Sequence, residues 1–154
     1  MQSNPQDAIY TADPHILSLA DWLGDPVAPA DFPATTLRFR NDRAARAVGL
    51  ADLDDAAWIA HFGRFAPLPG NLPQPLALRY HGHQFRVYNP ELGDGRGFLF
   101  AQMRDRRGRL MDLGTKGSGQ TPWSRQGDGR LTPKGAMREV LAAGKLEALG
   151  LNTS

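Results

Sequence analysis

Glycine is placed unevenly along this chain, in a pattern that restricts how its second half can fold. The tetrapeptide Gly-Asp-Gly-Arg occurs twice, at residues 93–96 and 127–130, and the run Gly-Thr-Lys-Gly-Ser-Gly lies between the copies at residues 114–119. Glycine lets the backbone approach another group closely and turn its N–H groups toward an anion, while Lys and Arg supply positive charge. The clustering therefore indicates loops that handle phosphate groups.

Two neighbouring segments, residues 97–104 and 109–116, have the pattern of strands. The first is rich in aromatic and aliphatic residues, and the second alternates between apolar and small or polar residues. The residues that join them, Asp105-Arg106-Arg107-Gly108, place a glycine where a tight turn needs left-handed backbone. We therefore expect an antiparallel hairpin whose second strand ends at Lys116.

The glycines at positions 93, 95 and 97 form a Gly-x-Gly-x-Gly run that enters the first of these strands. Such a run suits a loop draped over phosphates, and a plain β-turn with an aspartate as its turn former explains it equally well. It is not a dinucleotide fingerprint, because no helix follows. Residues 114–118 are not a Walker loop either, because the lysine precedes the Gly-Ser pair.

The last regular element is a helix with clear ends. Thr132 is a good N-cap, Pro133 suits the first helical position and Gly150 suits the position just past the end, which predicts a helix over residues 133–149. Apolar residues follow Glu139 at helical spacings of three, four and seven. We expect this carboxylate to project from the apolar side of the helix and to need a partner.

The pattern of the first half is weaker. Prolines interrupt residues 1–35 and predict an arm that wraps around the domain, with one helical candidate at residues 15–23. Short helices are expected at residues 41–49 and 54–62, and the proline-rich residues 66–75 are expected to be irregular.

Composition restricts the class of protein. With 154 residues, 41% of them apolar and 22% charged, the chain has the size and balance of one globular domain. A net charge of +2 gives no case for a nucleic-acid or membrane partner, and the arginines near residue 107 are expected to be a solvated turn. The lack of cysteine excludes thiol chemistry, and no apolar stretch suits a membrane span or a leader. We expect a cytoplasmic protein.

Lys116 and Glu139 occur in the order found in kinase-like domains. There a strand lysine holds nucleotide phosphates and a glutamate of the following helix orients it, because a flexible ammonium needs a fixed counter-charge. The alternative is a surface lysine and a half-exposed helix glutamate, which these two residues taken alone favour. The glycine-rich loops around Lys116 favour the kinase-like interpretation.

Two further motifs remain open. His81-Gly82-His83 has a spacing that can bind a metal on a strand edge, but only two other histidines exist, so a structural pair bonded to the backbone is preferred. Asp128 would repel a bare phosphate, and it suits a ribose hydroxyl or an ion pair with Arg125 or Arg130.

Five motifs carry a family resemblance: Tyr-His-Gly-His-Gln-Phe at residues 80–85, residues 90–96, residues 116–125, residues 127–130 and Arg-Glu-Val-Leu at residues 138–141. Together they resemble the amino-terminal half of the SelO (YdiU) protein adenylyltransferases. The resemblance implies an α+β fold, the amino-terminal lobe of a protein-kinase-like domain with an antiparallel sheet and helices. It also implies ATP bound in a flipped orientation, so that AMP moves to a Ser, Thr or Tyr hydroxyl of a protein.

The resemblance also implies site residues. Nucleotide contacts would come from Gly93, Gly95, Arg96, Lys116, Asp128 and Gly129, with Glu139 as the partner of the lysine. The family's catalytic aspartate and its metal ligands would lie beyond Ser154, so no metal ligand is expected here. The chain is expected to be an inactive fragment of an enzyme that uses ATP with Mg²⁺ or Mn²⁺.

The resemblance divides the chain into residues 1–79, an arm with short helices, and residues 80–154, the nucleotide-binding part. The chain departs from the family's usual residues at Arg86, Gly97 and Trp123, where glycine, alanine and tyrosine are common. Kinase-like phosphoryl transfer and a non-catalytic nucleotide-binding module are the alternative functions.

Overall fold

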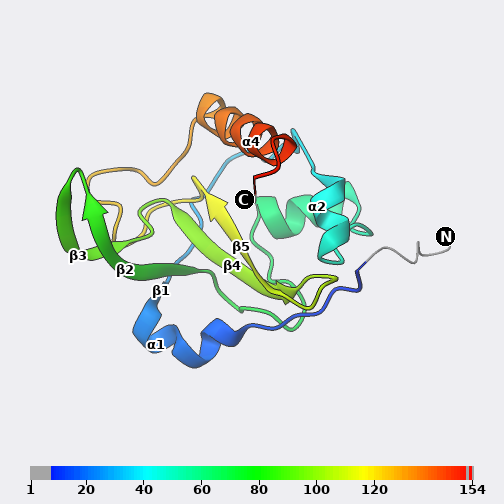
Figure 1. The fold of residues 1–154 in the computed structure, drawn as a ribbon, viewed down its shortest axis with the longest axis horizontal. Helices are drawn as coiled ribbons and strands as arrows, with labels where there is room; N and C mark the ends of the chain where they lie inside the picture. Colours follow the sequence, from blue (N-terminus) through cyan, green and yellow to red (C-terminus); the bar gives the residue numbers. More distant parts are fainter. Residues whose placement is uncertain (1–7, 152, 154) are drawn as a thin grey trace.

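The computed structural model describes residues 8–151 and 153 and is built around an antiparallel sheet (Figure 1). Its strands, in chain order, are β1 (Gly24–Pro26), β2 (Leu76–Gln84), β3 (Val87–Gly93), β4 (Gly97–Arg104) and β5 (Leu110–Lys116). The neighbours in the sheet are β1, β2, β4 and β5 in that order, and β3 pairs with β2. This α+β arrangement confirms the predicted fold class, an antiparallel sheet with helices compatible with a kinase-like amino-terminal lobe.

Strand β2 contributes to two ladders. Its first residues pair with β1 and, through Leu76 and Leu99, with β4, whereas residues 79–84 pair with β3. The β2–β3 hairpin consequently projects from the sheet on the side away from α2, as Figure 1 shows. The boundary at residues 79 and 80 falls within β2, and the division of the chain into two parts stays a prediction.

The core is centred on β4, whose residues 98–103 are all buried. Both faces of β4 are covered, which explains why its buried residues form a continuous run and do not alternate with exposed ones. Ile16 of the arm packs with Leu99 in one cluster, while Phe62 and Phe65 meet Phe100 edge to face, with ring centroids 5.8 and 5.6 Å apart. The arm and the short helices thus enclose the central strand from opposite sides.

Five short helical elements confirm the three helical segments predicted in the first half of the chain. The predicted residues 15–23 contain η1 (His15–Leu19) and α1 (Ala20–Leu23), and residues 41–49 contain α2 (Asp42–Ala47). The predicted residues 54–62 correspond to α3 (Asp55–Trp58) and the π-helical turn η2 (Ile59–Gly63). Side-chain oxygens start two of them: Asn41 accepts from the Ala44 N–H at 3.1 Å and Asp54 accepts from the Ala57 N–H at 2.7 Å.

The hairpin of β4 and β5 matches its prediction to within one residue. Asp105 holds the turn, because its carboxylate accepts from the backbone N–H groups of Arg107 and Arg109 at 2.8 and 2.9 Å, and Gly108 takes a positive φ of 74°. The predicted last helix is also confirmed as α4 (Pro133–Ala148), with the Thr132 hydroxyl accepting from the Gly135 N–H at 3.2 Å.

The surface of α4 is open to solvent. Its residues are all exposed or half-buried, and the larger apolar side chains Met137, Val140 and Leu141 are exposed. Glu139 contacts Lys116 of β5 and so has the partner that its position in the helix was expected to need. Of the helices the structure describes, none has the length and hydropathy that a membrane span requires.

Candidate nucleotide-binding site

The predicted lysine–glutamate pair is present. Lys116 ends β5 opposite Gly97 of β4, and its Nζ lies 3.1 Å from Oε2 of Glu139 in α4. Both side chains are about half exposed, at 48% and 54%. Solvent screening makes such a pair a weak source of stability, so its main effect is to orient the ammonium group. A half-exposed, oriented ammonium is still accessible to a phosphate.

The first Gly-Asp-Gly-Arg copy forms the connection from β3 to β4 and is fastened to β2. Asp94 donates its N–H to the Leu78 carbonyl at 2.9 Å, and its carboxylate accepts from the Leu78 N–H at 3.0 Å. Burial raises the pKa of Asp94, and the hydrogen bond from Leu78 partly offsets that rise. The side chain therefore anchors the loop.

The loop after Lys116 packs on this first copy. The Ser124 hydroxyl donates to the Gly95 carbonyl at 2.6 Å, and the Thr121 hydroxyl donates to the Asp94 carbonyl. Closer to the lysine, the Gly117 N–H donates to the Arg96 carbonyl at 2.6 Å. Ser124 therefore uses its hydroxyl to hold the loop.

The second copy meets the same loop from the other side. The Gly119 N–H donates to the Gly129 carbonyl at 3.2 Å, and Ser118 and Arg130 form an antiparallel bridge. A Cβ at Gly129 would lie 1.9 Å from the Gly119 carbonyl oxygen, and the φ of Gly129 is 69°. Only glycine fits at position 129, where the backbones of Gly119 and Gly129 touch, a contact called the glycine crossing below.

The residues singled out for nucleotide contact therefore lie on adjacent segments. Gly93, Gly95 and Arg96 are on the first copy and Asp128 and Gly129 are on the second, while Lys116 starts the loop that touches both. Their contact with a nucleotide stays a prediction.

Asp128 has a more local role than the predicted ion pair with an arginine. Its carboxylate accepts from the backbone N–H of Arg130 at 2.9 Å, and within the described residues 8–151 and 153 it forms no ion pair with Arg125 or Arg130. Arg125 instead donates to Gln84 at the end of β2, and the Arg130 guanidinium lies 5.0 Å from the Phe32 ring centroid.

A pocket adjoins Asp128. Its lining comes from the arm and from both sides of the glycine crossing: Ala28, Ala30, Gln120, Asp128 and Arg130. The arm is fixed there because the Ala30 N–H donates to the Ser118 carbonyl at 2.8 Å. Sequence reasoning did not find the arm residues of this pocket, because they carry no chemical motif.

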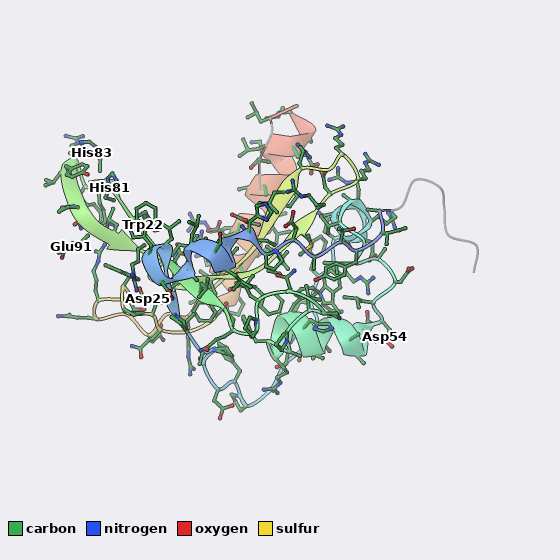
Figure 2. All side chains as sticks on the ribbon, turned by 90° about the horizontal axis from the view of Figure 1, so that it is seen from below. Trp22, Asp25, Asp54, His81, His83 and Glu91 are labelled. Atoms are coloured by element: carbon green, nitrogen blue, oxygen red, sulfur yellow. The ribbon has the colours of Figure 1, made fainter. Side chains whose placement is uncertain are left out.

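The two histidines of the hairpin differ from the expected backbone-bonded pair. Nδ1 of His81 lies 2.6 Å from the Tyr88 hydroxyl, and the His83 ring meets the Tyr88 ring edge to face at 5.5 Å. In Figure 2 both histidines lie toward the outer end of the hairpin, away from Trp22 and Asp25 at its base. Among the residues that the structure describes, no three His, Asp or Glu side chains gather into a group that could hold a metal.

Sequence reasoning also missed a contact between the arm and the loop after Lys116. Trp123 donates its indole N–H to Asp25 at 3.0 Å, although 98 positions separate the two residues. Position 123 departs from the family's usual tyrosine, but no local pattern in the sequence connects this position with β1.

Comparisons with known proteins identify the family. A family model described as protein adenylyltransferase SelO matches residues 8–154. The protein nucleotidyltransferase YdiU of Synechococcus elongatus is 55% identical over 143 residues, which are 92% of this chain and 28% of that protein. The protein of the same name from Synechocystis is 55% identical over 146 residues, 94% of this chain and 30% of that protein. A more distant one from Aeromonas hydrophila is 43% identical over 133 residues.

The chain thus spans less than a third of the length of the curated relatives it matches. The family match includes both Gly-Asp-Gly-Arg copies and the lysine–glutamate pair that the structure brings together. This agrees with the resemblance seen in the sequence, and the chain belongs to the SelO family.

Proposed function

We propose that this chain is the ATP-binding part of a protein adenylyltransferase that transfers AMP from ATP to Ser, Thr or Tyr hydroxyls of proteins. The observation that carries the proposal is the 3.1 Å contact between Lys116 Nζ and Glu139 Oε2, beside the glycine crossing. An ammonium held in this way positions phosphate oxygens in kinase-like enzymes. The family name supports transfer of a nucleotide over transfer of a phosphate.

In the proposed reaction, the oxygen of a protein hydroxyl forms a bond to the α-phosphorus of ATP. The bond between that phosphorus and the oxygen bridging to the β-phosphorus breaks, pyrophosphate leaves, and the hydroxyl proton passes to a base. Lys116 would compensate negative charge on the phosphates. The glycines at positions 93, 95 and 129 would let the backbone approach them, with Arg96 and Asp128 beside the nucleotide.

The catalytic base and the metal ligands are proposed to lie outside residues 1–154. The support is the length of the relatives, of which this chain spans 28–30%. Mg²⁺ or Mn²⁺ is proposed as the metal of the full-length protein, because nucleotidyl transfer needs a metal that bridges the phosphates.

The test uses the full-length protein with ATP labelled at either the α- or the γ-phosphorus. Adenylyl transfer labels a protein target from α-labelled ATP only, whereas phosphoryl transfer labels it from γ-labelled ATP only. A protein that binds ATP and labels nothing would be a non-catalytic module. Labelling from the γ-position alone would overturn the proposal.

A matched pair of variants assigns the role of the lysine. Lys116→Ala should lower kcat/KM for ATP by roughly a hundredfold, because it removes a positioned charge from the phosphates. Lys134→Ala should leave it unchanged, because that side chain lies in the exposed first turn of α4. Equal activity of the two variants would remove the special role of Lys116.

A further inference from the structure

A closed ring of contacts connects the arm with the first Gly-Asp-Gly-Arg copy. Asp25 of β1 accepts from the Trp123 indole N–H at 3.0 Å and from Nε of Arg79 at 3.0 Å, and Nη2 of Arg79 donates to its second oxygen. Arg79 is the antiparallel partner of Gly93 across β2 and β3. The ring closes where Trp123 meets Gly93.

Trp123 covers both glycines of this copy. A Cβ at Gly93 would lie 2.3 Å from Cγ of the indole, and a Cβ at Gly95 would lie 3.1 Å from the Trp123 carbonyl oxygen. The glycine at 93 therefore has the indole ring directly against its backbone. The ring therefore limits where the backbone of Gly93 can lie, and the backbone of Trp123 limits where Gly95 can lie.

Trp123 is held at two places, its backbone and its ring. Within its own loop, the Trp123 backbone N–H donates to the Thr121 hydroxyl at 3.0 Å, and that hydroxyl donates to the Asp94 carbonyl. From the arm, the Asp25 carboxylate fixes the outer edge of the ring through the indole N–H. Asp25 is thus the contact that sets the ring's orientation.

Asp25 is itself well held. The Arg79 hydrogen bonds lower the pKa of Asp25, so the carboxylate is ionised at neutral pH and accepts strongly from the indole. Nη1 of Arg79 donates to the carbonyls of Asp21 and Trp22 at 3.3 and 3.4 Å, which ties the guanidinium to the end of α1.

We propose that Asp25 and Trp123 are positioning residues, which hold the backbone of residues 93–95 in the conformation that receives the phosphates of a nucleoside triphosphate. The inference rests on the proposed function. Neither side chain needs to touch the nucleotide, because Asp25 acts through Trp123 and Trp123 acts through Gly93. The arm, which contributes none of the residues assigned by family resemblance, would then tune nucleotide affinity.

The test is steady-state kinetics of the full-length protein with Trp123→Phe and Asp25→Ala. Trp123→Phe keeps a ring against Gly93 but removes the N–H, and Asp25→Ala removes the acceptor. We expect each variant to raise the KM for ATP about tenfold, because each removes the charge-assisted hydrogen bond between the indole and Asp25, the one bond that both variants lose. The kcat should change less than twofold, because neither residue is near the reacting atoms in the proposal.

A double variant distinguishes a positioning role from a general loss of structure. If Asp25 acts only through Trp123, the combined variant Asp25→Ala, Trp123→Phe should have the KM of the worse single variant, not the product of both effects. Asp25→Asn should restore part of the affinity, because its amide oxygen still accepts from the indole. Should Asp25→Ala not fold, Trp123→Phe and Asp25→Asn carry the test.

Matched controls lie on the same arm. Trp22→Phe is the same substitution at a residue that is 73% exposed, and Asp21→Ala removes an exposed carboxylate but keeps the backbone carbonyl that accepts from Arg79. Both should keep the wild-type KM.

The inference is overturned if Trp123→Phe and Asp25→Ala have the wild-type KM for ATP, or if their effects on KM multiply in the double variant. If these variants behave like wild type while Lys116→Ala uses ATP poorly, only the positioning role fails. If Lys116→Ala also uses ATP like wild type, the proposed function fails as well.

Discussion

Gly119 and Gly129 lie in contact through their backbones, with the Gly119 N–H donating to the Gly129 carbonyl at 3.2 Å. This contact joins the loop after Lys116 to the second Gly-Asp-Gly-Arg copy, and it leaves no room for a side chain at position 129. The fold therefore requires glycine at position 129 for steric reasons that do not depend on a ligand.

Gly129→Ala should therefore destabilise the chain by more than about 2 kcal/mol, since it adds both a steric overlap and an unfavourable positive φ. Gly144→Ala is the control. Its Cβ would meet open space among the described residues, on the exposed surface of α4, and should stabilise the helix by up to about 1 kcal/mol. Urea denaturation measures the unfolding free energy of both variants. Similar values for the two would contradict the close contact of Gly129 with Gly119.

Glu139→Gln removes the counter-charge of Lys116 with little change of shape. We expect the KM for ATP of the full-length protein to rise roughly fivefold to tenfold, because the ammonium loses its fixed orientation. Unfolding free energy should change by less than about 1 kcal/mol, since both partners are half exposed.

Glu147→Gln is the matched control for Glu139→Gln. Glu147 also lies in α4 and also forms an ion pair, with Arg43 of α2, but it is remote from the glycine loops. Its variant should bind ATP like wild type. An equal loss of affinity in both variants would mean that α4 needs its ion pairs for docking and that Lys116 is not specifically oriented.

Two aspartates should affect stability with opposite signs as pH falls. Hydrogen bonds from Arg79 lower the pKa of Asp25, so its contribution to stability is complete above its unfolded-state pKa of about 3.9 and is lost as pH falls through the lower folded-state value. Burial raises the pKa of Asp94, so its ionised form disfavours the folded state, and protonation relieves that cost as pH falls through the raised value.

Asp25→Asn should accordingly be less stable than wild type at pH 7, with the difference shrinking below about pH 4. Asp94→Asn should be at least as stable as wild type at pH 7, because an amide oxygen still accepts from the Leu78 N–H without a buried charge. Denaturant titrations at several pH values give both curves. A destabilised Asp94→Asn at neutral pH would contradict the burial of that carboxylate.

Local signals explain which elements could be predicted from the sequence. The ends of α4 follow from Thr132 and Gly150, and the β4–β5 hairpin follows from the glycine of its turn, because caps and turns depend on residues close in sequence. The contact of Lys116 with Glu139 follows from their order only together with the glycine-rich loops around Lys116, because the two residues alone favour a surface lysine and a half-exposed glutamate.

The β2–β3 hairpin could not be found in this way. Its turn residues Phe85 and Arg86 have positive φ values of 53° and 66°, a conformation that usually requires Gly or Asn, so the sequence shows no turn there. The contact of Asp25 with Trp123 is missed for another reason. It joins segments distant in the chain, and only the packing of the arm against β2 brings them together.

The 154-residue chain on its own should not transfer AMP to itself or to an added protein, even with ATP and Mg²⁺ or Mn²⁺. Nucleotidyl transfer needs a residue that orients the attacking hydroxyl and a metal that bridges the phosphates. The acidic residues of the glycine motifs are engaged elsewhere, Asp94 with Leu78 and Asp128 with Arg130. Incubation with α-labelled ATP, with the full-length protein as positive control, measures the difference. Metal-dependent, denaturation-resistant label on the chain alone would place the missing catalytic groups within residues 1–154 and refute this part of the proposal.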